Sequence, residues 1–341
     1  IDQGTSSTRV LLFDAKANII AQHQIPLLSS YPAEAWVEQG PQAIWKDTLT
    51  CCRSVVYQAR ISMQQVIGIG ISNQRETTIV WDKSTGQPVY PAIGWQDRRT
   101  AQYCQALSLP EIQRSISKKT GLLIDPYFSA SKIHWILENV PGARKSADNN
   151  QLAFGTVDSF LLWQLTGGKV HATDATNASR TMLFNIHEQS WDQSLLDLFH
   201  IPASMLPKVQ DSASEFGRTS LDLFQHEIPI TGIAGDQQAA SIGQAVFQPG
   251  MIKSTYGTGC FILMNTGDDV IASKHRLIST VAYRINNKVT YGLEGSIFSA
   301  GSAIQWLLDT MHPTGDVSET QSMAMSVEDT DGIYMVPAFT G

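Results

Sequence analysis

A short polar run near the start of the chain has the composition of a phosphate-binding turn. Gly4 lets the backbone approach a phosphate closely, and Thr5, Ser6 and Ser7 offer N–H and O–H donors to its oxygens. Asp2 precedes the run and offers a carboxylate oxygen, which Mg²⁺ takes together with phosphate oxygens. An ordinary hairpin turn explains the same residues about equally well, because Gly and Ser are frequent in turns.

A second glycine turn, Gly257-Thr258-Gly259, lies between two apolar stretches much later in the chain. Thr258 could donate to a phosphate there, although a lone Gly-x-Gly is weak evidence by itself. Two such turns in separate parts of the chain are more informative than either. Together they suit a nucleotide that is held across a cleft.

Asp236 follows a predicted buried strand, residues 230–234. A carboxylate at the end of such a strand can accept the proton of an attacking hydroxyl group. The alternative is an N-cap for the helix that begins at Gln237, because Asp is favoured at that position. A cap explains Asp236 but does not explain the two amide side chains, Gln237 and Gln238, that follow it.

A dense polar run, residues 72–78, contains the adjacent side chains of Arg75 and Glu76 directly after another predicted buried strand. A neighbouring donor and acceptor can grip vicinal hydroxyl groups, although an exposed, salt-bridged turn is the commoner outcome for adjacent charges. Trp95 and Tyr127 also stand beside polar residues. They could wall a polyol site or lie at the edge of the core.

Strands and helices mix along the chain, so the predicted class is α/β. Apolar residues at helical spacing predict helices over residues 41–62, 131–140, 237–245 and 301–311. Apolar runs predict buried strands over residues 10–13, 66–71 and 230–234. Turn signals predict hairpins of residues 77–81 with 89–95 and of residues 279–285 with 289–294. A domain boundary is expected near residues 236–250.

The composition excludes several classes of protein. A length of 341 residues suggests about two domains. The 31 acidic and 24 basic residues give a net charge of −7, and the absence of a Lys/Arg run argues against nucleic acid or an anionic membrane as a partner. No apolar stretch approaches the ~20 residues of a spanning helix. The four cysteines lack metal spacing, which points to a reducing, cytoplasmic setting.

Taken together, these motifs resemble the glycerol kinases of the FGGY carbohydrate-kinase family, within the actin/sugar-kinase superfamily. The resemblance runs from Ile1 to Gly341 and rests on residues 2–9, 72–78, 95–100, 125–129, 154–158, 174–181, 232–238 and 255–260. It implies two ribonuclease-H-like domains of the actin/hexokinase type with a cleft between them. Residues 1–240 would form the N-terminal domain, which binds glycerol and phosphate, and residues 241–341 the start of the nucleotide-binding C-terminal domain.

The two ends of the chain look interrupted, because Ile1 lies inside a motif and Gly341 follows a strand-like segment. We therefore expect a piece of a longer native chain. Relative to the family, the strand before Ile1 would be missing and the second domain would be incomplete.

The resemblance also implies a reaction, the conversion of ATP and glycerol to sn-glycerol 3-phosphate and ADP with Mg²⁺ as cofactor. Asp236 matches the catalytic base, which takes the proton of the glycerol 3-hydroxyl. The matching glycerol-binding residues are Arg75, Glu76, Tyr127, Asp236 and Gln237, with Trp95 and Phe261 as the apolar wall. The matching phosphate- and nucleotide-binding residues are Thr5, Ser6, Ser7, Arg9, Thr258, Gly301 and Gln305, and Asp2 matches the carboxylate near Mg²⁺.

Two other functions stay open at this point. Another FGGY kinase would phosphorylate a pentitol or a ketose, and a non-catalytic actin-like regulator would bind nucleotide without needing Asp236 beside Arg75 and Glu76. Residues 216–228 lack the Gly-rich stretch with Arg that bacterial glycerol kinases use for fructose-1,6-bisphosphate, so this control is not expected. The sequence leaves the oligomeric state open.

Overall fold

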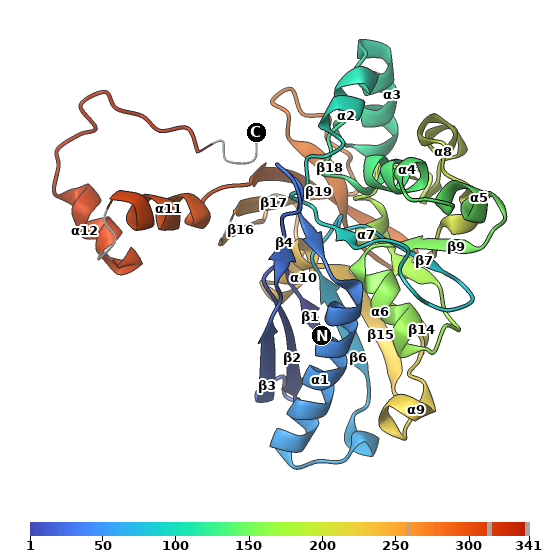
Figure 1. Ribbon diagram of the computed structural model, residues 1–341. Coiled ribbons are helices and arrows are strands. Elements are labelled where there is room, and N and C mark those ends of the chain that lie inside the picture. The colour runs from blue at the N-terminus through green and yellow to red at the C-terminus, as the bar shows by residue number, and fades with distance from the viewer. Residues whose placement is uncertain (258, 312–315, 338–341) are drawn as a thin grey trace.

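Two separate β-sheets organise the chain in a computed structural model, which describes residues 1–257, 259–311 and 316–337 (Figure 1). The larger sheet has the strand order β14-β15-β6-β1-β2-β3. Strand β6 runs parallel to both β1 and β15, whereas the other neighbouring pairs are antiparallel. The strands are β1 (Asp2–Gln3), β2 (Ser7–Phe13), β3 (Ile19–Pro26), β6 (Ile69–Asn73), β14 (Ala213–Arg218) and β15 (Pro229–Gly235).

The second sheet is antiparallel throughout and has the order β16-β17-β19-β18. Its strands are β16 (Ile252–Tyr256), β17 (Cys260–Gly267), β18 (Ile278–Ile285) and β19 (Lys288–Ile297). The hairpin expected across Asn286 and Asn287 is confirmed. Both residues have positive φ angles, 52° and 59°, as a two-residue hairpin turn requires.

Helices α1 and α6 pack against the larger sheet, whereas α2 to α5 and α8 gather beyond the upper end of that sheet (Figure 1). The helices are α1 (Pro41–Ala59), α2 (Ala101–Leu107), α3 (Pro110–Thr120), α4 (Ser129–Asn139), α5 (Ala143–Asp148), α6 (Val157–Leu165), α7 (Ala175–Ala178), α8 (Gln193–Phe199), α9 (Leu221–Phe224), α10 (Asp236–Gly243), α11 (Gly301–Met311) and α12 (Thr320–Met325). Short strands complete the fold: β4 (Ser29–Ser30), β5 (Glu38–Gln39), β7 (Ile79–Asp82), β8 (Ala92–Ile93), β9 (Leu152–Gly155), β10 (Ala172–Asp174), β11 (Phe184–Asn185), β12 (Ser190–Trp191) and β13 (Lys208–Gln210).

Helix α1 shows why the apolar spacing predicted the elements well. Pro41 occupies the first turn, where its missing N–H costs nothing, and Ile44, Cys51 and Val55 are buried against the larger sheet. Arg60 then takes the left-handed conformation and ends the helix. The predicted helices over 131–140, 237–245 and 301–311 are confirmed as α4, α10 and α11.

Three sequence-based expectations are wrong in part. Phe13 is 53% exposed, because the end of β2 lines an apolar hollow of about 610 Å³ and is not covered on both faces. Ile67 is 90% exposed, because β6 begins only at Ile69. The hairpin of residues 77–81 with 89–95 is reduced to single antiparallel bridges, and β7 forms its ladder with β9 instead.

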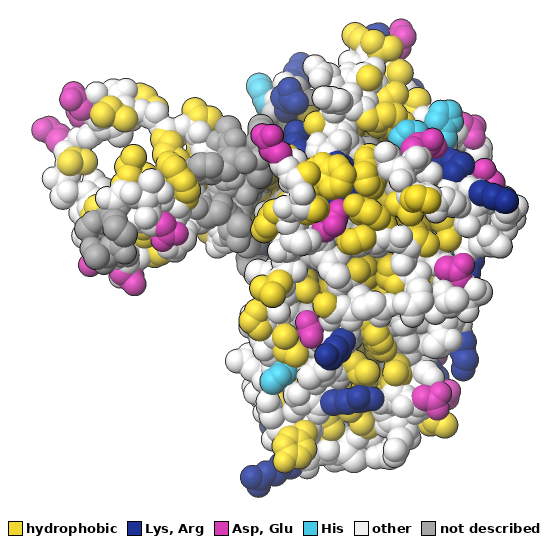
Figure 2. Space-filling view, viewed as in Figure 1, with side chains coloured by type: hydrophobic (Ala, Val, Ile, Leu, Met, Phe, Trp, Pro, Cys, Tyr) yellow, Lys and Arg dark blue, Asp and Glu magenta, His cyan; other side chains and the backbone are white. Residues whose placement is uncertain are grey.

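Helices α11 and α12 lie away from the rest of the chain (Figure 1). Apolar side chains are exposed over this segment, including Met311 and Met325, which are 72% and 80% exposed (Figure 2). Acidic and basic side chains are interspersed on the face that Figure 2 shows. Within the described residues, no helix combines the length and apolar character that crossing a membrane requires.

Candidate active site

The carboxyl ends of β6 and β15 bring two of the predicted motifs together. These strands are parallel neighbours, and Gly235 pairs with Asn73 at their last positions. Arg75 and Glu76 follow β6, and Asp236 follows β15, so the three side chains meet beyond one edge of the sheet. The Nε atom of Arg75 lies 3.4 Å from Oδ1 of Asp236. Ligand sites of open α/β sheets lie outside such carboxyl ends.

The backbone at Glu76 is strained and is held in place by a buried lysine. Glu76 has a φ of 62°, and the Thr77 N–H donates to the Arg75 carbonyl at 2.7 Å, which closes a γ-turn. The Lys132 ammonium donates to the carbonyls of Glu76 (3.1 Å) and Tyr127 (2.8 Å). Burial lowers the pKa of Lys132 to about 8. Strain of roughly 1–3 kcal/mol persists only where the surroundings enforce it, and Lys132 does so here.

A cavity of about 170 Å³ lies between these motifs and the second sheet. The cavity is lined by Thr5, Arg75, Glu76, Trp95, Gln96, Tyr127, Asp236, Gln237, Thr255, Gly257, Gly259 and Phe261. All the glycerol-binding residues that the sequence predicted are among them. Drug-sized ligands occupy pockets of roughly 300–1,000 Å³, so this cavity suits a smaller molecule.

Aromatic rings form one wall of this cavity. Trp95 stands edge-on to Phe261 and to Tyr127, with ring centroids 5.9 Å and 5.8 Å apart. Phe298, which the sequence reasoning missed, packs against the rings of both Trp95 and Tyr127. The Trp95 indole N–H donates to the Thr5 hydroxyl at 2.8 Å, which joins the aromatic wall to the predicted phosphate turn.

Asp236 is the first residue of α10, and Gly235 occupies the N-cap position. The alternative role of Asp236 as the N-cap is therefore wrong. Its carboxylate accepts from the Gln237 N–H at 2.7 Å, and its side chain is 34% exposed toward the cavity. Its surroundings raise the pKa of Asp236 to about 6, because burial outweighs the lowering effect of the Arg75 guanidinium.

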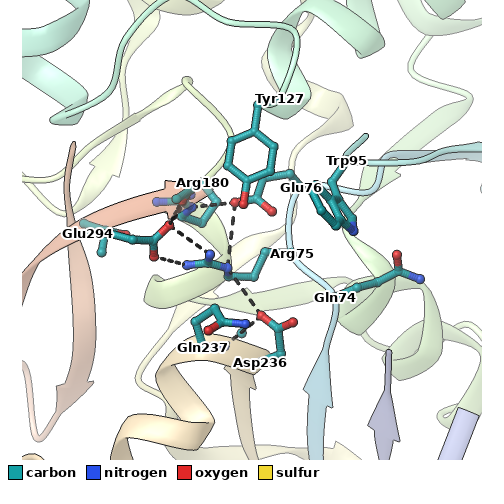
Figure 3. A network of polar contacts seen from close by, with 12 residues as sticks. Gln74, Arg75, Glu76, Trp95, Tyr127, Arg180, Asp236, Gln237 and Glu294 are labelled. Atoms are coloured by element: carbon teal, nitrogen blue, oxygen red, sulfur yellow. Dashed lines mark hydrogen bonds and ion pairs between the residues drawn. The ribbon is translucent and has the colours of Figure 1, made fainter. Parts of the chain in front are cut away.

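Arg75 and Glu76 belong to a buried network of four charged side chains (Figure 3). The Glu294 carboxylate, from β19, accepts from Nη1 and Nη2 of Arg75 at 2.6 Å and 3.0 Å. Arg180 donates to Glu76 at 2.6 Å and to Glu294 at 3.0 Å. Burial opposes the ionisation of Glu294, but the two guanidinium groups outweigh it and lower its pKa to about 2.

This network excludes the alternative of an exposed salt-bridged turn, because Arg75 and Glu76 are only 2% and 1% exposed. Sequence reasoning missed Arg180 and Glu294. Arg180 lies in the segment 174–181, which carried part of the resemblance, but no property of the segment marked its arginine as a partner of Glu76.

Lys253 is a second buried charge that the sequence reasoning missed. It lies on β16, is fully buried, and donates to the side-chain oxygen of Gln237. Burial lowers the pKa of Lys253 to about 8. Because the amide oxygen of Gln237 is engaged in this way, its amide nitrogen is the atom left to donate to a ligand.

The predicted phosphate turn connects β1 to β2. The Gly4 N–H donates to the Ser7 carbonyl at 2.9 Å, and Gly4 does not take a left-handed conformation. Only Thr5 of the turn lines the cavity, while Ser6 is exposed. These positions are compatible with a turn that faces a ligand beyond the cavity.

Asp2 and Arg9 face each other across the strands that flank this turn, with Oδ2 and Nη2 2.5 Å apart. The described residues contain no group of three or more His, Cys, Asp or Glu side chains that could hold a metal. Mg²⁺ is commonly held by one or two carboxylates together with phosphate oxygens and water. A single carboxylate such as Asp2, beside a phosphate turn, fits that donor set.

The second glycine turn joins β16 to β17, as the sequence predicted. A Cβ atom at Gly259 would lie 2.6 Å from the Ile297 carbonyl oxygen, so only glycine fits there. Thr258 lies outside the described residues. The Gly301 N–H, at the start of α11, donates to the Gly257 carbonyl at 2.9 Å. Gln305 lies further along α11, where its amide donates to Asp309 of the same helix at 2.7 Å, and it does not line the cavity.

The chain belongs to the FGGY family of carbohydrate kinases. The model of the family's N-terminal domain matches residues 1–243, and that of its C-terminal domain matches residues 252–341. Over its whole length, the chain is 58% identical to the glycerol kinase of Coxiella burnetii (strain Dugway 5J108-111) and 57% identical to that of Alcanivorax borkumensis. It covers 68% of the length of each of these relatives.

Solved structures of similar fold are also kinases. The chain superposes on Plasmodium falciparum glycerol kinase with ADP at a TM-score of 0.90 and 38% identity, covering all of this chain and 68% of that one. Xylulose kinase from Rhodospirillum rubrum, at 19% identity and a TM-score of 0.81, shares the fold, and the match covers 95% of this chain and 65% of that chain. The expected family and the actin/hexokinase-like α/β fold are therefore confirmed.

Proposed function

We propose that the protein transfers the γ-phosphoryl group of ATP to the 3-hydroxyl of glycerol, giving sn-glycerol 3-phosphate and ADP. The observation that carries this proposal is the small cavity in which Asp236, Arg75, Glu76 and Gln237 converge beside an aromatic wall. The names of relatives at 57–58% identity support the same reaction. The Plasmodium falciparum glycerol kinase was crystallised with ADP, which supports an adenine nucleotide as the phosphoryl donor.

In this mechanism, Asp236 is the general base that accepts the proton of the attacking hydroxyl. A base with a pKa near 6 is ionised at neutral pH and still basic enough to help. Arg75 and Gln237 donate to the other polyol oxygens, and Glu76 accepts from them. The rings of Trp95 and Phe261 pack against the carbon chain and keep water from the reacting hydroxyl.

The phosphate end of the mechanism rests on the two glycine turns. Backbone N–H groups of residues 5–7 and the Thr5 hydroxyl hold phosphate oxygens on one side, and the glycine turn that carries the predicted donor Thr258 holds them on the other. Phosphoryl transfer depends mainly on positioning and charge neutralisation, so these turns and one base suffice. Asp2 would hold Mg²⁺, which when bound supplies positive charge to the phosphate oxygens.

A substrate panel tests the proposal on the purified gene product. ADP release would be measured with ATP and each of glycerol, a pentitol and a ketose, with and without a chelator of Mg²⁺. We expect glycerol to give the highest kcat/KM and the chelator to abolish turnover. Preference for the pentitol or ketose would assign a different acceptor, and nucleotide binding without any acceptor turnover would favour a regulator.

A cytoplasmic location is part of the same proposal. Cys51, Cys52, Cys104 and Cys260 are all free thiols, as is usual in a reducing compartment. Fractionation of cells that express the tagged gene product would test this location.

A further inference from the structure

Two buried charged side chains of the second sheet contact polyol-facing side chains that follow the carboxyl ends of β6 and β15. Glu294 on β19 contacts Arg75, and Lys253 on β16 contacts Gln237. Neither Glu294 nor Lys253 lines the cavity. Both are at most 1% exposed, so neither can be explained as a solvated surface charge.

Glu294 determines which edge of the Arg75 guanidinium is left for a ligand. Its carboxylate occupies Nη1 and Nη2, at 2.6 Å and 3.0 Å, and the Gln238 amide oxygen accepts from Nη1 as well at 3.3 Å. Nε of Arg75 is buried and has no hydrogen-bond partner among the described residues. It lies 3.4 Å from Asp236 and 3.8 Å from Glu76, so this N–H, which makes no hydrogen bond, faces the proposed base and the neighbouring carboxylate.

The Glu294 carboxylate also holds Glu76, the hydrogen-bond acceptor next to Arg75, in place. Arg180 bridges Glu294 and Glu76, with distances of 3.0 Å and 2.6 Å. The guanidinium of Arg180 also lies 5.4 Å from the centre of the Tyr127 ring. Glu294 therefore holds Arg75 directly and Glu76 through Arg180 (Figure 3).

Lys253 acts on Gln237, the other side chain that donates to the polyol. An amide side chain can present either its oxygen or its nitrogen, and the ammonium of Lys253 engages the oxygen of Gln237. Replacing the Lys253 ammonium by an apolar group would allow the Gln237 amide to rotate by half a turn and exchange its oxygen and nitrogen. The rotated Gln237 side chain would then present its oxygen, a hydrogen-bond acceptor, to the ligand in place of its N–H donors.

We propose that Glu294 and Lys253 are positioning residues for the acceptor substrate, through which the second sheet sets the hydrogen-bonding pattern of the polyol site. This inference depends on the proposed function in one respect only, namely that the acceptor substrate is a molecule with several hydroxyl groups. It predicts that the acceptor site loses affinity when these contacts are removed, although neither residue touches the acceptor.

Glu294→Gln in the purified gene product is the main test. The neutral amide cannot accept from both Nη atoms of Arg75, so Arg75 loses its fixed orientation. We expect the acceptor KM to rise by roughly 10- to 100-fold, as for the loss of a hydrogen bond to a charged group, while the ATP KM changes by less than about twofold. Glu294→Asp keeps the charge, withdraws it by one methylene, and should give a smaller rise. Lys288→Gln, an exposed position on the same strand, is the matched control and should leave both constants unchanged.

The Arg75→Ala background separates positioning from general destabilisation. If Glu294 acts chiefly through Arg75, then Glu294→Gln raises the acceptor KM of Arg75→Ala by a clearly smaller factor than it raises that of the unchanged protein. The remaining effect is the share that runs through Arg180 and Glu76. Lys253→Met should raise the acceptor KM of the otherwise unchanged protein by roughly threefold to tenfold, because one oriented donor is lost.

Three results would overturn the inference. The first is an acceptor KM within about twofold of the unchanged protein for both Glu294→Gln and Glu294→Asp. The second is a full additional loss in the Arg75→Ala background. The third is an absence of any polyol or sugar acceptor. If the acceptor is a pentitol and not glycerol, the proposed function fails, but the same variants measured with the pentitol still decide this inference.

Discussion

Replacement of Asp236 by Asn isolates its charge from its shape. Asn has nearly the same size, and its side-chain oxygen can still accept from the Gln237 N–H, now 2.7 Å from the carboxylate. Since Gly235 and not Asp236 is the N-cap of α10, no cap is lost. Arg75 loses a partner at 3.4 Å but keeps its pair with Glu294. The fold and both substrate sites should therefore survive the change.

The expected loss is confined to turnover. A neutral amide cannot accept the hydroxyl proton, and removal of a general base typically costs ~10²–10⁴-fold in rate. This loss corresponds to about 3–6 kcal/mol in the activation barrier, at roughly 1.4 kcal/mol per factor of ten. The unchanged protein should lose kcat as the pH falls through about 6, because only the ionised Asp236 accepts a proton. The residual rate of Asp236→Asn should lack this acidic limb.

The assay follows ADP release with saturating glycerol and ATP between pH 5 and 9, and determines kcat and both KM values. Thermal unfolding of the same samples measures stability, and the melting temperature should change by only a few degrees. A kcat within tenfold of the unchanged protein would refute the role of Asp236 as base. An acidic limb that persisted in Asp236→Asn would show that another group controls the pH dependence.

Three further substitutions test the rest of the site. Arg75→Ala should raise the glycerol KM by roughly 10- to 100-fold, and should move the acidic limb of kcat to higher pH, because Arg75 lowers the pKa of Asp236; an unmoved limb would contradict the pairing. Trp95→Phe keeps the aromatic wall but removes the N–H donated to Thr5, so the ATP KM should rise by roughly two- to tenfold and more than the glycerol KM does; equal changes would refute this link. Asp2→Asn should raise the Mg²⁺ concentration that gives half-maximal rate by roughly tenfold or more, because even the loss of an outer-shell partner of a metal typically has an effect of this size. An unchanged Mg²⁺ requirement would show that Asp2 is not part of the metal site.

The residues of the site that directly follow the ends of β6 and β15 could be predicted from the sequence. The polar runs at residues 72–78 and 235–238 each follow a buried apolar strand. Parallel pairing of those strands then suffices to bring Arg75 beside Asp236. Sequence spacing could not predict that Phe13 and Ile67 are exposed, because their exposure depends on where each strand ends in the sheet and on what covers its face.

Partners from distant parts of the chain were beyond sequence reasoning. Glu294 lies 219 residues after Arg75, and Arg180 lies 104 residues after Glu76. In a strand such as β19, an isolated glutamate has the same local pattern whether it faces water or a guanidinium. The tertiary arrangement of the two sheets decides between these outcomes, and the hydrophobic periodicity of the sequence does not predict that arrangement.

Stability alone is a poor explanation for the four charges in this network. Withdrawing four ionised side chains from water carries a desolvation cost of several kcal/mol for each, and apolar replacements of similar volume are often as stable as a buried ion pair. What apolar side chains cannot do is hold one edge of a guanidinium while leaving Nε beside Asp236. The network is therefore better explained by the orientation that it imposes on Arg75 and Glu76, and the cavity needs both sheets in place to recognise a polyol.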